Sequence, residues 1–290
     1  VLVACQADES KGKYSRRDYV RILNYAAQDK IRKYTITNDP DDAELILFVG
    51  SSEVNFTDIR QSTIYLKYRH KSVLYFSGDK LVPLLPGLYP CLEANRFGIK
   101  TLSRASSYYL RVTDNTTLDI EQSIHDAKYL FSFKGNCANH PIRKKLMGLS
   151  HQRAFLYDSS TTRYVHSDYD NATYLEILEQ SKFVLCPRGI GVSSWRLFET
   201  MRAGRVPVII SDNWIEPAGP NWSTCSIRIK ESDLNSIVSL LEEHEDKACQ
   251  FAANARKEWE RYYSSETVFN SIITQAENCL IAARTEGLIH

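Results

Sequence analysis

One short loop in the sequence combines glycines, serines and an arginine, in the stretch CPRGIGVSS that follows the apolar run FVL. Gly189 and Gly191 let the main chain approach a ligand closely, and Ser193 or Ser194 can cap the helix expected next. The start of a helix offers unpaired N–H groups, and Arg188 adds a full positive charge with a geometry that suits phosphate. The loop therefore predicts a diphosphate site. The spacing matches neither a P-loop nor the dinucleotide-binding glycine motif, so an ordinary strand-to-helix turn with a solvated or ion-paired arginine fits equally well.

Several charged residues outside this loop are candidates for the same site. Arg196 and Glu199 lie three residues apart on the expected helix and can pair with each other. Alternatively, Glu199 faces the ligand and accepts the hydroxyl groups of a ribose. Lys134 and Arg143, near a neighbouring strand-to-helix junction, are further cations that can neutralise a departing diphosphate. For any one of these cations, a solvated position on a helix face is the more common role.

Apolar runs alternate with helix-like segments in both halves of the chain. In the first half, AELILFVGS and SVLYFSGD are typical of parallel strands buried on both faces, and a helix is expected near residues 18–30. The second half reads β-α-β-α-β-α-β and ends in amphipathic helices, the pattern of a Rossmann-like domain. A polar stretch near residues 113–126 separates the halves. We therefore expect an α/β protein with two domains, 1–125 and 126–290.

Composition limits the function classes. The chain has 36 basic and 35 acidic residues, a balance that argues against a nucleic-acid-coating protein. No apolar run is long enough to span a bilayer, although peripheral membrane association is possible. The seven scattered cysteines suggest free thiols in a reducing compartment, so a cytoplasmic or membrane-peripheral location is expected. The Golgi lumen is the alternative if an N-terminal anchor precedes Val1, and only there would four sequons matter. These sequons begin at Asn55, Asn115, Asn171 and Asn221.

The segment SKFVLCPRGIGVSSWRLFETMRAGRVPVIISD resembles the signature of the exostosin-like glycosyltransferases. In that family a strand, C-P-R-G, a serine pair, R-L-x-E and a small-residue turn into P-V-I precede an aspartate. The matching residues are Cys186, Pro187, Arg188, Gly189, Ser193, Ser194, Arg196, Leu197, Glu199, Gly204, Pro207, Val208, Ile209 and Asp212. Arg205 departs from the pattern, because the family often has a small residue or cysteine there. Weaker likeness extends upstream to LFSFKGN and HPIRKKL.

The resemblance implies a GT-B-like fold, in which two Rossmann-like domains face each other across a cleft. The first domain would lie on the acceptor side, and the second would bind a nucleotide-sugar donor, a UDP- or GDP-sugar. The implied reaction transfers the sugar to a hydroxyl of a glycan or polysaccharide with inversion. Arg188 would neutralise the diphosphate and Glu199 would hold the ribose. The expected donor-binding residues are Gly135, Arg143, Arg188, Gly189, Gly191, Ser193, Ser194, Arg196, Glu199 and Asp212.

An inverting transfer also needs a base that removes the proton of the acceptor hydroxyl from the opposite face of the sugar. Such a base should come from the first domain. Asp79, after the run SVLYFSG, is the first candidate, with Glu53 and His140 behind it. A Gly-Asp turn is common for conformational reasons alone, and this simpler interpretation of Asp79 is favoured.

We expect no metal and no cofactor other than the donor substrate. The stretch NDPDD, which contains Asp39, Asp41 and Asp42, precedes an apolar run and is typical of a turn. Trp214 and Trp222 flank a proline-rich loop and are candidate platforms for a sugar ring. Fold alone does not select the chemistry, so two alternatives remain open: a non-catalytic module that binds nucleotide sugars or glycans, and an epimerase or phosphorylase.

Overall fold

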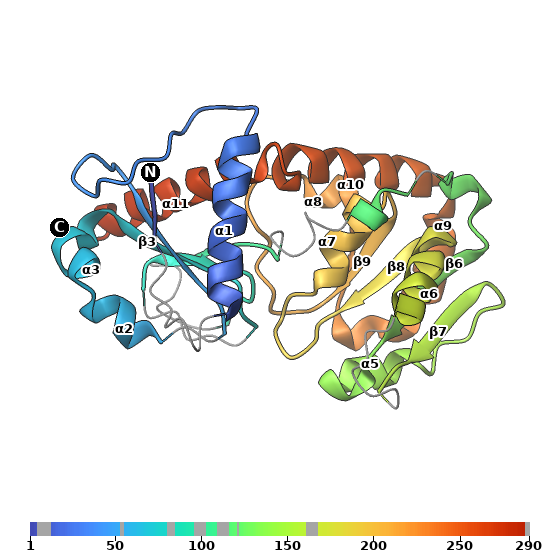
Figure 1. Cartoon of the computed structure of the whole chain (residues 1–290). Coiled ribbons are helices and arrows are strands. Elements are labelled where there is room, and N and C mark those ends of the chain that lie inside the picture. Colours follow the sequence, from blue (N-terminus) through green and yellow to red (C-terminus); the bar gives the residue numbers. More distant parts are fainter. Residues whose placement is uncertain are drawn as a thin grey trace. The chain divides into compact units, whose positions relative to one another are not determined.

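The computed structural model divides the chain into two compact α/β units (Figure 1). The first unit contains residues 1–114, 214–219 and 262–290, and the second contains residues 115–213 and 220–261. The residues that the structure describes are 1–4, 13–52, 55–79, 85–95, 103–108, 116–120, 122–160 and 168–287.

The first unit contains a five-stranded parallel sheet with the strands in chain order. The strands are β1 (Leu2–Ala4), β2 (Ile46–Gly50), β3 (Ser72–Phe76), β4 (Gly87–Tyr89) and β5 (Ser103–Ala105). Its helices are α1 (Lys13–Gln28), α2 (Phe56–Gln61), α3 (Thr63–Tyr68) and α11 (Val268–Thr285). Every residue of β2 and β3 is buried, as expected for apolar runs that form central parallel strands. The helix expected near residues 18–30 is α1, which begins five residues earlier.

The second unit contains another five-stranded parallel sheet, in the order β10-β9-β8-β6-β7. The strands are β6 (Tyr129–Gly135), β7 (Ala154–Asp158), β8 (Ser181–Pro187), β9 (Val206–Ile210) and β10 (Ile227–Ile229). The longer helices are α5 (Pro141–Leu146), α6 (Asp168–Glu179), α7 (Trp195–Arg202), α9 (Ile237–Glu243) and α10 (Ala248–Tyr263), and α8 (Trp222–Cys225) is a single turn. The chain order changes direction between β6 and β8. In open α/β sheets, ligands bind at such a switch point, beyond the carboxyl ends of the strands.

Short 3-10 helices connect these elements. They are η1 (Arg69–Lys71), η2 (Thr116–Leu118), η3 (Ile124–Asp126), η4 (Cys137–Asn139), η5 (Glu231–Ser236) and η6 (Glu245–Lys247). Gly204 follows α7 with a φ of 61°, a left-handed conformation that glycine adopts without strain, so it ends the helix as predicted.

The prediction of an α/β fold of the GT-B-like class, with two units and mainly parallel sheets, is confirmed. The domain limits differ from the predicted 1–125 and 126–290. The last helix, α11, returns to the first unit, where it packs against β3, β4 and β5 and buries residues such as Phe269 and Ile272. The polar stretch that suggested the boundary also contains a fully buried side chain of the second unit, Leu118. That the two sheets face each other across a cleft stays a prediction.

Candidate functional site

The arginine-containing loop leaves the carboxyl end of β8, next to the switch point of the second sheet. Two main-chain hydrogen bonds fix it: the N–H of Arg188 donates to Ile210 O at 3.0 Å, and that of Gly189 donates to Gly191 O at 3.1 Å. The neighbouring strand β6 ends at Gly135. The sequence prediction that these two strand ends share one edge of the sheet is therefore correct.

The loop leads into α7, whose first turn lacks a side-chain cap. Ser194 occupies the capping position with extended backbone angles, but its side chain makes no capping hydrogen bond. Ser193 is 6% exposed, and its buried hydroxyl has no hydrogen-bond partner among the described residues. The predicted capping bond by either serine is therefore absent from the described part of the chain. The helix start and one buried hydroxyl are left with unused hydrogen-bonding capacity.

The Arg188 side chain is half-buried and makes no hydrogen bond or ion pair to any described residue. Its buried Nε is one of the few unsatisfied polar atoms in this part of the chain. This excludes the alternative in which Arg188 pairs with Glu199. A buried guanidinium N–H without an acceptor is costly, so the loop is built to receive an acceptor from outside the described chain.

Arg143 has a different role from the one predicted. It is 8% exposed, and its guanidinium donates to three main-chain carbonyls: Arg188 O at 2.9 Å, Asn136 O at 3.2 Å and Pro187 O at 3.3 Å. These bonds tie the loop after β8 to the loop after β6. A Cβ atom at Gly189 would lie 3.0 Å from Arg143 Nη2, so the glycine makes room for this arginine. Arg143 therefore supports the loop, and its prediction as a donor ligand is corrected.

Arg196 also crosses between the two strand ends. Its Nη2 donates to Lys134 O, and its guanidinium lies 4.7 Å from the centre of the Phe133 ring. A Cβ atom at Gly135 would lie only 2.8 Å from this Nη2, so this approach requires glycine at that position. The buried Nε of Arg196 has no partner among the described residues. It lies in the same short stretch as the unsatisfied atoms of Arg188 and Ser193.

Glu199 does not pair with Arg196, three residues before it on α7. Its Oε2 accepts a hydrogen bond of 2.7 Å from the Tyr174 hydroxyl, and its Oε1 has no partner among the described residues. Burial raises the pKa of Glu199, while the hydrogen bond from Tyr174 and the charge of Arg196 lower it. Tyr174 was missed at the sequence level. The only signal was an aromatic residue on the helix that precedes β8, a position where core packing is the usual explanation.

Two other predicted residues are engaged elsewhere. Asp212 Oδ1 accepts the N–H of Glu231 at 2.8 Å, and Glu231 Oε1 accepts the N–H of Asp212 at 3.3 Å, so this aspartate closes a surface turn. His140 caps α5 through its Nδ1, 3.3 Å from the N–H of Ile142. Burial, and then the charge of Arg188, lower the pKa of His140. His140 belongs to the second unit, which contradicts its selection as a base from the first.

Asp79 lies in the first unit, after β3. Its Oδ1 accepts a 2.5 Å hydrogen bond from the Tyr108 hydroxyl, which also contacts the Cys91 thiol at 2.8 Å. Its role as a catalytic base stays a prediction. Glu53 lies outside the described residues.

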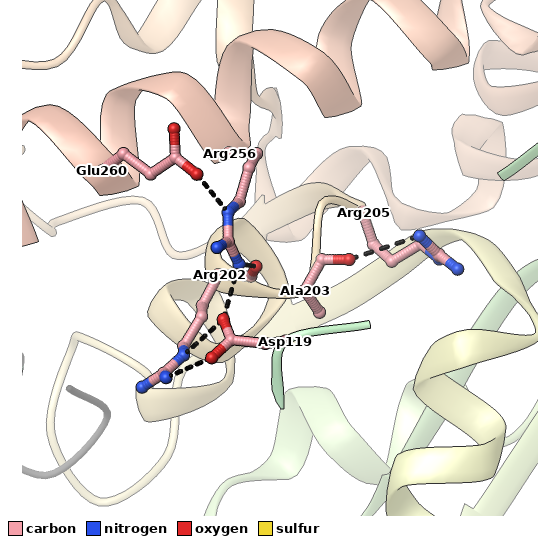
Figure 2. Close-up of polar contacts among 6 residues, drawn as sticks. All are labelled: Asp119, Arg202, Ala203, Arg205, Arg256 and Glu260. Atoms are coloured by element: carbon pink, nitrogen blue, oxygen red, sulfur yellow. Dashed lines mark hydrogen bonds and ion pairs between the residues drawn. The ribbon is translucent and has the colours of Figure 1, made fainter. Parts of the chain in front are cut away.

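Arg205, the departure from the family pattern, lies at the opposite end of α7 from the candidate site. Its guanidinium is buried and donates to the main-chain carbonyls of Gln122, Glu179, Ala203 and Gly204 at 2.8–3.2 Å (Figure 2 shows the bond to Ala203). In the same cluster, Asp119 joins Arg202 and Arg256 (Figure 2), with shortest N···O distances of 2.7 and 2.8 Å. These arginines fasten the end of α7, so the unusual residue does not affect the loop after β8.

The remaining candidates have structural contacts. Trp214 is 2% exposed, and its Nε1 donates to Pro90 O at 3.1 Å, so it is part of the first unit's core. Trp222 is buried edge-to-face against Phe198. Asp41 accepts a hydrogen bond from Tyr68 and pairs with Lys67. Within the described ranges, no group of three or more histidine, cysteine or acidic residues is placed to bind a metal. No helix in those ranges has the length and apolar character needed to span a bilayer.

Comparison with known proteins agrees with the loop motif. The family model of the exostosin GT47 domain matches residues 94–244. An Exostosin-1 homolog of Caenorhabditis elegans is 31% identical over 255 residues, which cover 71% of this chain and 66% of the relative. Exostosin-1b of Danio rerio is 34% identical over 103 residues, which cover 34% of this chain and 14% of the relative. The chain thus spans just under two-thirds of the first relative and a small part of the second.

Likenesses to solved structures are distant. A crystal structure of Anabaena HepE in complex with UDP aligns with 96% of this chain and 99% of its own, at a TM-score of 0.47 and 12% identity. TarM aligns with 89% of this chain and 57% of its own, at a TM-score of 0.42 and 12% identity. The family assignment depends on the sequence comparisons. Since the matched family model extends over more than half of the residues, the chain belongs to the exostosin GT47 family of glycosyltransferases.

Proposed function

We propose that this protein transfers a sugar from a nucleotide-diphosphate donor, a UDP- or GDP-sugar, to a hydroxyl of a glycan or polysaccharide, with inversion at the anomeric carbon. One observation carries the proposal. Three buried polar atoms without partners among the described residues, Arg188 Nε, Ser193 Oγ and Arg196 Nε, gather where the loop after β8 meets α7. A buried donor without an acceptor is rare unless a ligand completes it. The donor diphosphate supplies the oxygens that complete this set.

The reaction gives Arg188 its role. As the glycosidic bond breaks, negative charge grows on the leaving diphosphate, and a fixed cation beside an uncapped helix start stabilises that charge. Because the guanidinium of Arg188 has no carboxylate partner among the described residues, its charge is available to the phosphates. Glu199, with Oε1 unused, is placed on the same helix to accept the hydroxyls of the donor ribose.

An inverting reaction also needs a base for the acceptor hydroxyl. We assign this role to Asp79, since it lies beyond the carboxyl end of β3 and already accepts a hydrogen bond from Tyr108. The proposed reaction uses no metal, because the guanidinium and the helix start neutralise the diphosphate. The nucleotide sugar is a substrate, so no separate cofactor is required.

The test compares the Arg188→Ala variant with Arg69→Ala, which removes an exposed arginine of the first unit. Loss of a charged hydrogen-bonding group should weaken binding of the preferred UDP- or GDP-sugar about tenfold or more in Arg188→Ala. Transfer to an acceptor glycan should fall as well, with the melting temperature close to wild type. Unchanged turnover in Arg188→Ala would contradict the phosphate assignment. Binding without transfer or hydrolysis over a panel of donors and acceptors would instead support a non-catalytic module.

A further inference from the structure

Tyr174 contacts both functional side chains of α7. It lies on α6, the helix that leads into β8. Its hydroxyl donates to Glu199 Oε2 at 2.7 Å, and its ring centre is 5.8 Å from the guanidinium carbon of Arg196. Tyr174 thus lies beside two residues of opposite charge that do not bond to each other.

The missing Arg196–Glu199 pair needs a physical explanation. Side chains three residues apart on a helix are neighbours, and opposite charges at that spacing normally attract. Here Arg196 turns to Lys134 O and the Phe133 ring, while the carboxylate is held by Tyr174. A phenol that loses its hydroxyl can no longer hold the carboxylate, which is then free to turn toward Arg196.

The hydrogen bond also decides which carboxylate oxygen remains for a ligand. Tyr174 uses Oε2, and Oε1 has no partner among the described residues. Burial raises the pKa of Tyr174 well above its ordinary value, so the hydroxyl keeps its proton and remains a donor over the working pH range. One oxygen is therefore fixed, and the other is presented in a single orientation.

We propose that Tyr174 is a positioning residue, which holds the Glu199 carboxylate so that Oε1 accepts the ribose hydroxyls of the donor and the site selects ribose over deoxyribose nucleotides. This inference rests on the proposed function, because it requires that a nucleotide binds beside α7. It goes further by naming the group that makes the site selective for the sugar of the nucleotide.

Calorimetric titration with paired nucleotides tests the proposal. Uridine diphosphate and guanosine diphosphate, each with its 2′,3′-dideoxy counterpart, are titrated into wild type, Tyr174→Phe and the control Tyr157→Phe. Tyr157 is an exposed tyrosine on β7 of the same unit. Tyr174→Phe should bind the preferred ribonucleotide about fivefold or more weakly and the dideoxy nucleotide within about twofold of wild type. In a Glu199→Ala background, Tyr174→Phe should have no further effect on ribonucleotide binding.

The possible outcomes are distinguishable. Equal weakening of both nucleotides by Tyr174→Phe, or a further loss in the Glu199→Ala background, would show a merely structural role and overturn the inference. A smaller folded fraction lowers the binding stoichiometry of both nucleotides and leaves the ratio of their affinities unchanged, so a folding defect cannot imitate the expected result. If wild type binds neither diphosphate, the proposed function itself fails. If wild type binds one and Tyr174→Phe keeps the full preference for ribose, only this inference fails.

Discussion

Replacing Arg143 by leucine should destabilise the protein, although the same change at Arg188 should not. The guanidinium of Arg143 gives three hydrogen bonds, of 2.9, 3.2 and 3.3 Å, to the carbonyls of residues 188, 136 and 187. Leucine would leave these carbonyls without that donor in a site that is 8% exposed. At about 1 kcal/mol for each lost bond, the cost is about 3 kcal/mol.

Differential scanning calorimetry of wild type, Arg143→Leu and Arg188→Leu measures this cost. A loss of about 3 kcal/mol corresponds to a melting temperature roughly 10 °C lower for a unit of this size. Arg188 has no hydrogen-bond partner among the described residues, so its leucine variant should melt close to wild type. Nucleotide binding gives the complementary result: Arg188→Leu should lose it, and Arg143→Leu should keep part of it below its melting temperature. If Arg143→Leu melts like wild type and loses binding as completely as Arg188→Leu, Arg143 is a donor ligand and the reasoning is refuted.

Two further variants test the supports of the site and of the second unit. Gly135→Ala would place a Cβ atom 2.8 Å from Arg196 Nη2, so this arginine must move, and nucleotide affinity should fall several-fold while an alanine at the more open Gly148 leaves it unchanged. The hydrogen bond from Arg153, followed by that from Lys182, lowers the pKa of Glu245 from 4.5 to about 2. A lowered pKa stabilises the fold above pH 4.5, and that stabilisation disappears as the pH falls from 4.5 toward 2. Glu245→Gln should therefore melt lower than wild type at pH 7 and lose less stability over that acid interval; equal acid sensitivity of the two proteins would contradict the assignment.

The strands and the ligand-binding edge could be predicted because their signals are local. The runs that became β2, β3, β8 and β9 are short, continuous and apolar, and each is entirely or almost entirely buried in the parallel sheets. The loop after β8 carried its own signal, because glycines and an arginine between a strand and a helix have few uses other than a turn or an anion site. Local pattern was therefore enough to locate the edge.

Contacts between distant segments could not be predicted in this way. The sequence HPIRKKL reads as a solvated cationic helix, and the burial of Arg143 follows only from the adjacency of β6 and β8. The return of α11 to the first unit is equally invisible in an amphipathic tail, since the pattern shows that one face is buried but not against which sheet. Tyr174 was missed for the same reason, because its partner Glu199 lies 25 residues away on another helix.

The arginines of the second unit show how a structure separates a support from a ligand-binding group when the residue type is the same. Arg143 and Arg205 are both buried and give their N–H groups to main-chain carbonyls, so neither has the free hydrogen-bonding capacity that a phosphate needs. Arg188 and Arg196 each keep a buried Nε without a partner among the described residues, a cost that the fold alone does not explain. Since a bound anion would satisfy both groups at once, the donor phosphates should stabilise this loop as well as bind to it. Saturating nucleotide diphosphate should therefore raise the melting temperature of wild type but not that of Arg188→Leu.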